Sequence, residues 1–175
     1  MKDALLIPCR ITPEIFREFA VFDTMRRRKR WKGPALFAAM MAAFACVCFA
    51  QRGRQEQAVL IGGVLLAVGL GLPAVYFLSF FSSVRKKAKQ LKLDNANAAY
   101  TVTVSPESVS VTDGKQRAEY AWGDIVSVYR IRQSTCLYVA DNRAYLLPAG
   151  DRNDEACWAL ISRQVPSEKR NDLRK

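Results

Sequence analysis

Two long uncharged stretches divide the chain into parts with different hydrophobic patterns. Residues 34–50, PALFAAMMAAFACVCFA, and residues 58–81, AVLIGGVLLAVGLGLPAVYFLSFF, contain no charged side chain. At about 1.5 Å per residue, helices of these lengths would measure roughly 25 and 36 Å, which is close to a ~30 Å hydrocarbon core. A polar stretch, residues 51–57, joins the two. This pattern predicts an antiparallel transmembrane hairpin over residues 33–81.

The segment before the first span combines a short apolar run with a helical pattern. Residues 4–11, ALLIPCRI, fit a strand. Thr12-Pro13-Glu14 then predicts a helix start, with threonine as the N-cap and proline at the first helical position. Ile15, Phe19 and Phe22 fall on one face of this amphipathic helix. The helix either lies on the membrane surface or packs on the cytosolic domain, and its acidic residues favour packing.

Beyond the second span the period changes to two, which indicates β-strands. Six short strands are predicted, separated by turn signals such as SPE, DGK and DNR. They cover residues 100–104, 108–112, 118–122, 125–131, 136–140 and 144–147. A helix is predicted to open at Asp151, with acids in its first turn, and to end at Pro166. We expect a small, partly open antiparallel barrel of the pleckstrin-homology (PH) kind, closed by this helix, over residues 100–165.

The basic residues are concentrated beside the two spans. The net charge is +11, yet residues 93–175 hold eleven basic and eleven acidic side chains and are neutral. Six basic residues lie within 26–32, and five more, without an acid, lie within 82–92. Positive residues flanking a span favour the cytoplasmic side, so both termini are predicted to be cytoplasmic. Nucleic acid is not expected as a partner, because its binders spread basic residues over a folded face.

Small residues recur every four positions in both spans. The first span has Ala39 and Ala43, and the second has Gly63, Ala67 and Gly71. Such stripes let helix backbones approach closely in lipid. They either pack the hairpin on itself or pair the subunits of a homo-oligomer.

The residue types that catalysis and metal binding favour are sparse. The chain has no histidine, and its five cysteines lack the paired spacing of zinc sites. Without histidine, no cysteine has the usual base to activate it. Asp124 sits where a turn or cap aspartate belongs, and Trp122 is predicted to fill the core of the barrel. We therefore expect no enzyme activity, no cofactor and no metal.

Three arginines are the candidate contacts for a protein partner. Arg130 and Arg132 lie on or beside a predicted strand edge, and Arg143 opens the last strand. Recognition of a lipid headgroup is not favoured, because the first loop carries Glu107 and the second sets Asp113 against Lys115. The alternative is that the three arginines are ordinary solvated strand residues.

A family resemblance is carried mainly by turns and structural aromatics. Trp122-Gly-Asp124-Ile125-x-x-Val128, then Leu137-Tyr-Val139 and Tyr145-Leu-Leu-Pro148, are similar to the C-terminal domain of the YcxB-like family. The layout is similar as well, from the Thr-Pro-Glu helix through two adjacent spans to a basic exit, and the resemblance covers residues 10–165. It implies a bacterial membrane protein of no established activity. Pro148, together with Trp158 in the C-terminal helix, is expected to be structural.

The domain layout follows from these patterns. We expect a cytosolic N-terminal segment at 1–32, the hairpin at 33–81, a basic exit and linker at 82–99, the PH-like domain, and a polar tail at 166–175. The expected function is non-enzymatic: a multi-pass protein of the bacterial cytoplasmic membrane presents its domain to an unknown cytosolic protein, for binding or regulation. The alternative is a self-assembling membrane scaffold.

Overall fold

The computed structural model describes residues 4–51, 53, 57–91, 93, 100–114, 116–150 and 153–174. Some residues of the sequence predictions lie outside these ranges. They are most of the turn between the spans, Lys92 and most of the linker, Lys115 and Asp151. The chain forms two compact units, one from Met1–Phe19 with Ala88–Lys175 and the other from Ala20–Lys87.

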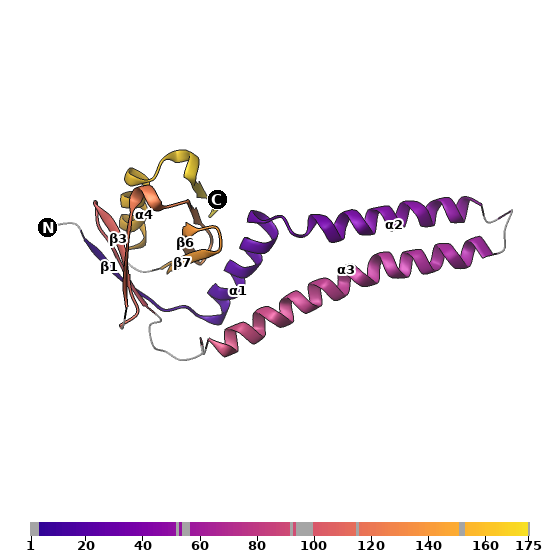
Figure 1. Ribbon diagram of the computed structural model, residues 1–175, viewed down its shortest axis with the longest axis horizontal. Coiled ribbons are helices and arrows are strands. Elements are labelled where there is room, and N and C mark those ends of the chain that lie inside the picture. Colours follow the sequence, from indigo (N-terminus) through magenta and orange to yellow (C-terminus); the bar gives the residue numbers. More distant parts are fainter. Residues whose placement is uncertain are drawn as a thin grey trace. The chain divides into compact units, whose positions relative to one another are not determined.

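The first unit contains two four-stranded sheets (Figure 1). One has the strand order β1-β2-β3-β4 and the other β7-β6-β5-β8. The strands are β1 (Leu5–Cys9), β2 (Tyr100–Val104), β3 (Ser108–Thr112), β4 (Arg117–Ala121), β5 (Ser127–Arg130), β6 (Ser134–Ala140), β7 (Arg143–Pro148) and β8 (Arg170–Asp172). All neighbours are antiparallel except β5 and β8. The six predicted strands after residue 99 and the N-terminal strand are confirmed, but neither sheet closes into the expected barrel.

Alternating side chains build one core between the sheets and the helix α4 (Asp154–Gln164). In β2, Val102 and Val104 are buried, and in β3 Val109 and Val111 are buried, as a period of two requires. The core consists of Ile7, Cys9, Val102, Val104, Val109, Val111, Ile125, Val128, Leu137, Leu147, Cys157, Ile161 and Val165. Cys157 and Ile161, four residues apart, form the inner stripe of α4.

The polar segment after α4 contains a further short element that the domain layout did not include. A 3-10 turn, η3 (Ser167–Lys169), leads into β8, which pairs in parallel with β5. The N–H of Leu173 also donates to the carbonyl of Arg130 at 2.8 Å. Hydrophobic periodicity missed this strand, because it is short and carries mainly polar side chains.

The N-terminal helix starts as predicted and its first part belongs to the β-rich unit. Helix α1 (Pro13–Val21) is capped by the Thr12 hydroxyl, which accepts from the N–H of Ile15 at 3.3 Å. The Glu18 carboxylate accepts from the backbone N–H groups of residues 132 and 133, both at 3.1 Å. The Phe19 ring lies 6.3 Å from the Tyr138 ring, centroid to centroid. Packing of this helix on the domain is therefore confirmed.

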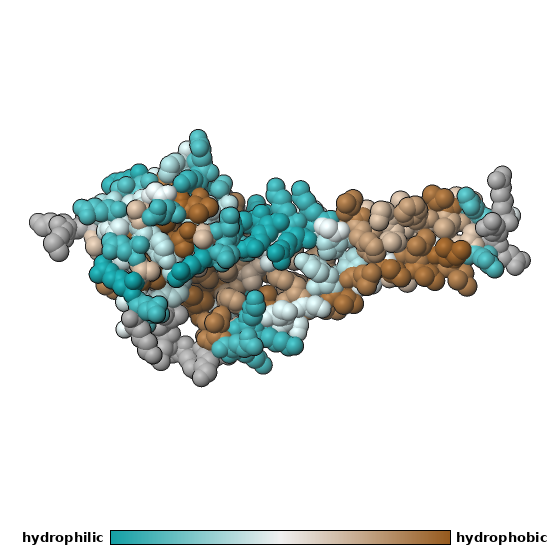
Figure 2. Space-filling model, in the orientation of Figure 1, coloured by the Kyte–Doolittle hydropathy of each residue, from teal (hydrophilic) through white to brown (hydrophobic). Residues whose placement is uncertain are grey.

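The second unit contains two long apolar helices, α2 (Lys32–Ala50) and α3 (Gln57–Gln90). Both are long and apolar enough to cross a membrane. Most of their side chains are exposed, unlike those of a core helix in a soluble protein, and Figure 2 shows hydrophobic residues gathered over them. Helix α3 continues through Pro73 and includes most of the predicted basic exit. A π-helical turn, η1 (Phe22–Arg27), leads into the basic run. Asp23 in this turn forms ion pairs with Arg27 and Arg28.

Close packing between the two helices depends on glycines other than the predicted ones. A Cβ atom at Gly69 would lie 2.6 Å from the Cβ of Met41, and one at Gly62 would lie 2.8 Å from the Phe49 ring. By contrast, a Cβ at Gly63 or Gly71 meets nothing within 4 Å. The predicted stripe residues are all exposed, namely Ala39, Ala43, Gly63, Ala67 and Gly71. The interpretation that they pack the hairpin on itself is wrong, and subunit pairing stays a prediction.

Candidate functional site

Arg130 forms the centre of an internal charged cluster. Its guanidinium donates to Asp154 at 3.2 Å and to Glu155, and Asp172 lies 3.7 Å away. The guanidinium also lies over the Trp158 ring, 5.2 Å from the centroid. These groups come from β5, α4 and β8, so the cluster joins three elements that are distant in sequence.

The burial of Arg130 contradicts its predicted role as an exposed anchor. The residue is only 5 % exposed, because it follows buried Val128 by two positions and so lies on the same, core-facing side of β5. Burial lowers the pKa of the Arg130 guanidinium, but hydrogen bonds to Glu155 and Asp154 outweigh it and leave that pKa raised. The side chain is therefore charged and held inside the unit. Its Nε has no hydrogen-bond partner among the described residues.

The other two candidate arginines are exposed but do not share one site. Arg132 lies in the turn between β5 and β6, beside a depression formed partly by Glu14 and Arg174. Arg143 opens β7, and its guanidinium stacks over the Tyr145 ring at 5.5 Å. It borders a different, smaller depression beside the turn between β3 and β4. The structure therefore does not bring together the predicted triplet of arginines.

The buried cysteines are poor nucleophiles. Burial raises the pKa of the Cys9 thiol to about 12, and it raises that of Cys157 to about 12 as well. Both thiols are therefore protonated at neutral pH, and a protonated thiol reacts slowly. In the described part of the chain, no group of three or more cysteines and carboxylates is placed to hold a metal ion.

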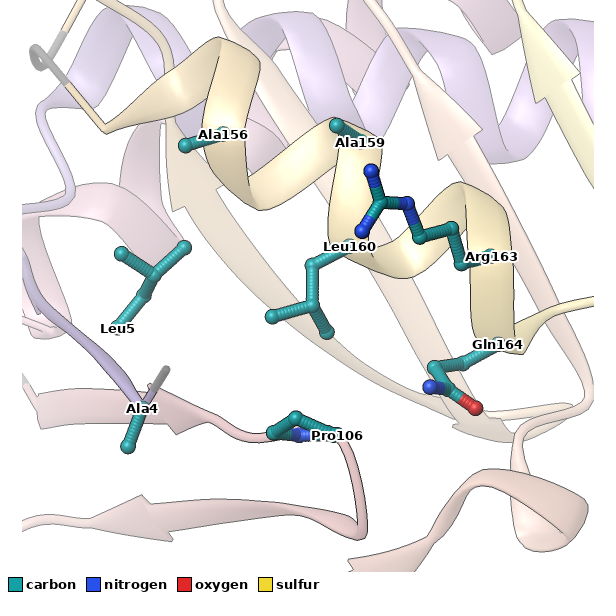
Figure 3. A pocket seen from close by; sticks show the side chains of 8 residues that line it. All are labelled: Ala4, Leu5, Pro106, Ala156, Ala159, Leu160, Arg163 and Gln164. Carbon is teal, nitrogen blue, oxygen red and sulfur yellow. The ribbon is translucent and has the colours of Figure 1, made fainter. Parts of the chain in front are cut away.

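An apolar groove between α4 and the first sheet is a further candidate site. It has a volume of about 450 Å³ and lies beside the start of β1 and the turn between β2 and β3 (Figure 3). The residues that define it are Leu5, Pro106, Ala156, Ala159, Leu160 and Arg163. In Figure 3 Leu160 and Gln164 point from α4 toward the strand side. The groove combines an apolar floor with one cation, an arrangement that suits an amphipathic, anionic ligand.

The comparisons with known proteins add no relative. No family model, no curated protein and no solved structure matches the chain. The resemblance to the YcxB-like family therefore stays a prediction from sequence motifs. The motif residues make structural contacts here: the indole of Trp122 donates to the carbonyl of Ser105 at 3.1 Å, and the Asp124 carboxylate accepts from the N–H of Ala121 at 3.3 Å.

The remaining predicted structural residues also have local roles. Pro148 ends β7 opposite Ser134. Trp158 is half-buried and lies under both Arg130 and Arg170, the latter 6.0 Å from the ring centroid.

The groove was missed by sequence reasoning because its walls carry no motif. Ala156 and Ala159 are small residues on the solvent side of a helix, where alanine is common for its helix propensity alone. Only their position opposite Leu5 and Pro106 gives them significance, and that position depends on the long-range pairing of β1 with β2. The one local signal was the pair of exposed alanines, Ala156 and Ala159, one turn apart on the predicted helix.

Proposed function

We propose that the protein is a non-enzymatic membrane protein that presents its β-rich unit to the cytoplasm, where the unit binds another protein. One observation carries the topology: β1, which precedes the two apolar helices, pairs with β2, which follows them. Two strands can pair only on the same side of a membrane. An even number of crossings between them is therefore required, and two helices supply it.

The distribution of charge supports the cytoplasmic side. Basic residues precede α2 and continue at the end of α3, and positive flanks are retained in the cytoplasm. The motifs similar to the YcxB-like family support the same bacterial membrane setting. Under this proposal the two four-stranded sheets and α4 are a PH-like domain whose sheets remain open.

Binding rather than catalysis is favoured by the chemistry of the β-rich unit. Its groove is lined mainly by alkyl groups, with one guanidinium and one amide, and no nucleophile next to a base lines it among the described residues. Burial raises the pKa of the Cys9 and Cys157 thiols, which lowers their reactivity. A shallow apolar surface of this kind is suited to contact with another polypeptide.

The test is photocrosslinking in living cells with the full-length protein. A photoreactive residue replaces Ala156, Arg132 or Arg143, all of which are exposed on the β-rich unit. We expect the photoreactive residue in at least one position to crosslink to one specific other protein, which mass spectrometry identifies. Crosslinks to lipid or to the protein itself at every position would contradict the proposal.

A self-assembling scaffold is the second candidate. The observation that favours it is the exposed stripe of Gly63, Ala67 and Gly71, which the hairpin does not use for its own packing. Small residues on a lipid-facing surface allow a second helix to approach closely. Gly71→Leu should then reduce self-association in nanodiscs, measured by single-molecule photobleaching, and an unchanged subunit number would exclude this candidate.

A further inference from the structure

We propose that the groove between α4 and β1 binds an extended peptide segment of the partner, with apolar side chains and one carboxylate. This proposal rests on the proposed function, because it names the class of partner that the β-rich unit would bind. The segment adds a strand along the free edge of β1, and its carboxylate pairs with Arg163. Three features of the described residues support this occupant: an open strand edge, an apolar floor and an unopposed cation.

The strand edge is the first feature. β1 is the outer strand of its sheet and pairs with β2. Pro8, opposite Thr101, has no N–H to donate, and within sheets proline occupies positions whose nitrogen faces the unpaired edge. Because backbone direction alternates along a strand, Leu6 then presents its N–H and C=O to that same edge. An added strand can pair with these groups.

The floor of the groove is the second feature. Ala156 and Ala159 leave a shallow trough along α4, and Leu160 and Leu5 supply its apolar base. Alternate side chains of an added strand point the same way, so every second side chain of the segment would enter this trough.

The charge of the groove is the third feature. Arg163 is exposed in the last part of α4, and no acidic side chain lines the groove among the described residues. Figure 3 shows its guanidinium beside Ala159, at the rim. A guanidinium binds a carboxylate through two parallel hydrogen bonds. Gln164 adds an amide that can donate or accept.

The shape of the groove distinguishes a peptide from other occupants. A small-molecule site buries most of its ligand's surface, whereas this groove is open along one side. A second copy of the chain paired through β1 would bring Leu5–Cys9, which has no carboxylate, against the groove. An extended, acid-bearing segment matches both the open side and the cation.

The experiment begins with the crosslink from Ala156 and identifies the crosslinked segment by mass spectrometry. A synthetic peptide of that segment is then titrated against the full-length protein in nanodiscs by fluorescence anisotropy. We expect Ala159→Trp, which fills the trough, to weaken binding at least about tenfold, and Arg163→Ala about fivefold or more. The controls Arg132→Trp and Arg143→Ala, at exposed residues outside the groove, should stay within about twofold.

Two further readouts test the geometry directly. A peptide whose carboxylate is replaced by an amide should bind more weakly and should lose its sensitivity to Arg163→Ala, because the pair is already broken. Backbone amides in the segment containing Leu6 should exchange more slowly with deuterium when the peptide is bound. Equal sensitivity of both peptides, or unchanged exchange in β1, overturns the proposal.

The outcomes separate this proposal from the proposed function. Foreign crosslinks from Arg132 or Arg143 alone would overturn the groove as the site and leave partner binding intact. Crosslinks from Ala156 to a helical segment, to a segment without an acid, to lipid or to a second copy would also overturn the groove proposal. No foreign crosslink at any position would overturn both.

Discussion

At the scale of single residues, Arg130 lies in a strand, as the sequence predicts, but it is buried rather than exposed. The alternation along β5 puts it on the same face as Val128, which is the core face. Charge alone suggests solvent, but Asp154, Glu155 and Asp172 compensate it from elements far along the chain. Sequence could place the residue on a face, but it could not supply its partners.

We predict that Arg130→Met destabilises the protein by about 1–3 kcal/mol, because the largely buried carboxylate of Asp154 loses its buried partner and keeps only Arg174. Arg132→Met, at an exposed position, should change stability by less than about 0.5 kcal/mol. Thermal unfolding of the full-length protein in detergent micelles, followed by tryptophan fluorescence, measures both. Equal melting temperatures for the two variants would show that the cluster contributes no net stability.

Two glycines of α3, Gly69 and Gly71, should respond differently to substitution by leucine. Gly69→Leu should force α2 and α3 apart, because even its Cβ would collide with Met41. Gly71→Leu should leave the hairpin closed, because space is open there. The periodicity of small residues is visible in the sequence. Which of them face the other helix depends on the rotation of both helices about their axes, so the sequence did not predict the contacts of Gly62 and Gly69.

The separation of the helices can be measured by double electron–electron resonance. Spin labels at Leu36 of α2 and Leu72 of α3, both exposed, would report the distance in a background with Cys46 and Cys48 replaced by alanine. The distance should widen in Gly69→Leu and not in Gly71→Leu. The reverse result would mean that the stripe of Gly63 and Gly71 forms the contact within the hairpin.

At the scale of elements, the strands and spans were predictable because their periodicity is strong. Strand β2 is present over the predicted residues, and the two spans lie within α2 and α3. The short strand β8 was not predictable, since hydrogen bonds to β5 and the ion pair of Asp172 with Arg130 hold it rather than apolar alternation. Just after the strand, Arg174 pairs with Asp154. Elements that depend on distant partners give little local signal.

We predict that Leu173→Pro releases this C-terminal element. Proline removes the N–H that bonds to the carbonyl of Arg130 and leaves that acceptor unsatisfied, at a cost of about 1–3 kcal/mol. Leu173→Ala keeps the N–H and is the matched control. Faster hydrogen exchange in β5 is expected for the proline variant beyond that of the alanine variant. Identical exchange in the two variants would show that the bond does not hold β8 in place.

At the scale of the whole molecule, the pairing of β1 with β2 constrains the proposed membrane topology. β1 and β2 flank the two apolar helices in sequence but are neighbours in one sheet. A chain inserted with its flanks on opposite sides could not form that pair. Under the proposed topology, the fold of the β-rich unit would therefore act as a check on insertion, independent of the flanking charges. No sequence pattern predicted that β1 pairs with β2, because the apolar run at residues 4–11 does not indicate which strand it pairs with.

The last prediction concerns the charges that orient the hairpin under the proposed topology. Replacing the five basic residues of 26–30 with glutamine should leave most chains with both flanks in the cytoplasm, because Arg85, Lys86, Lys87 and Lys89 still favour that side for the other flank. Neutralising both flanks should give a mixture in which whole hairpins are inverted, while β1 and β2 still meet. C-terminal fusions to green fluorescent protein, which reports the cytoplasm, and to alkaline phosphatase, which reports the outside, measure the proportions. A population with its two ends on opposite sides, yet with a folded β-rich unit, would contradict the coupling between sheet and span.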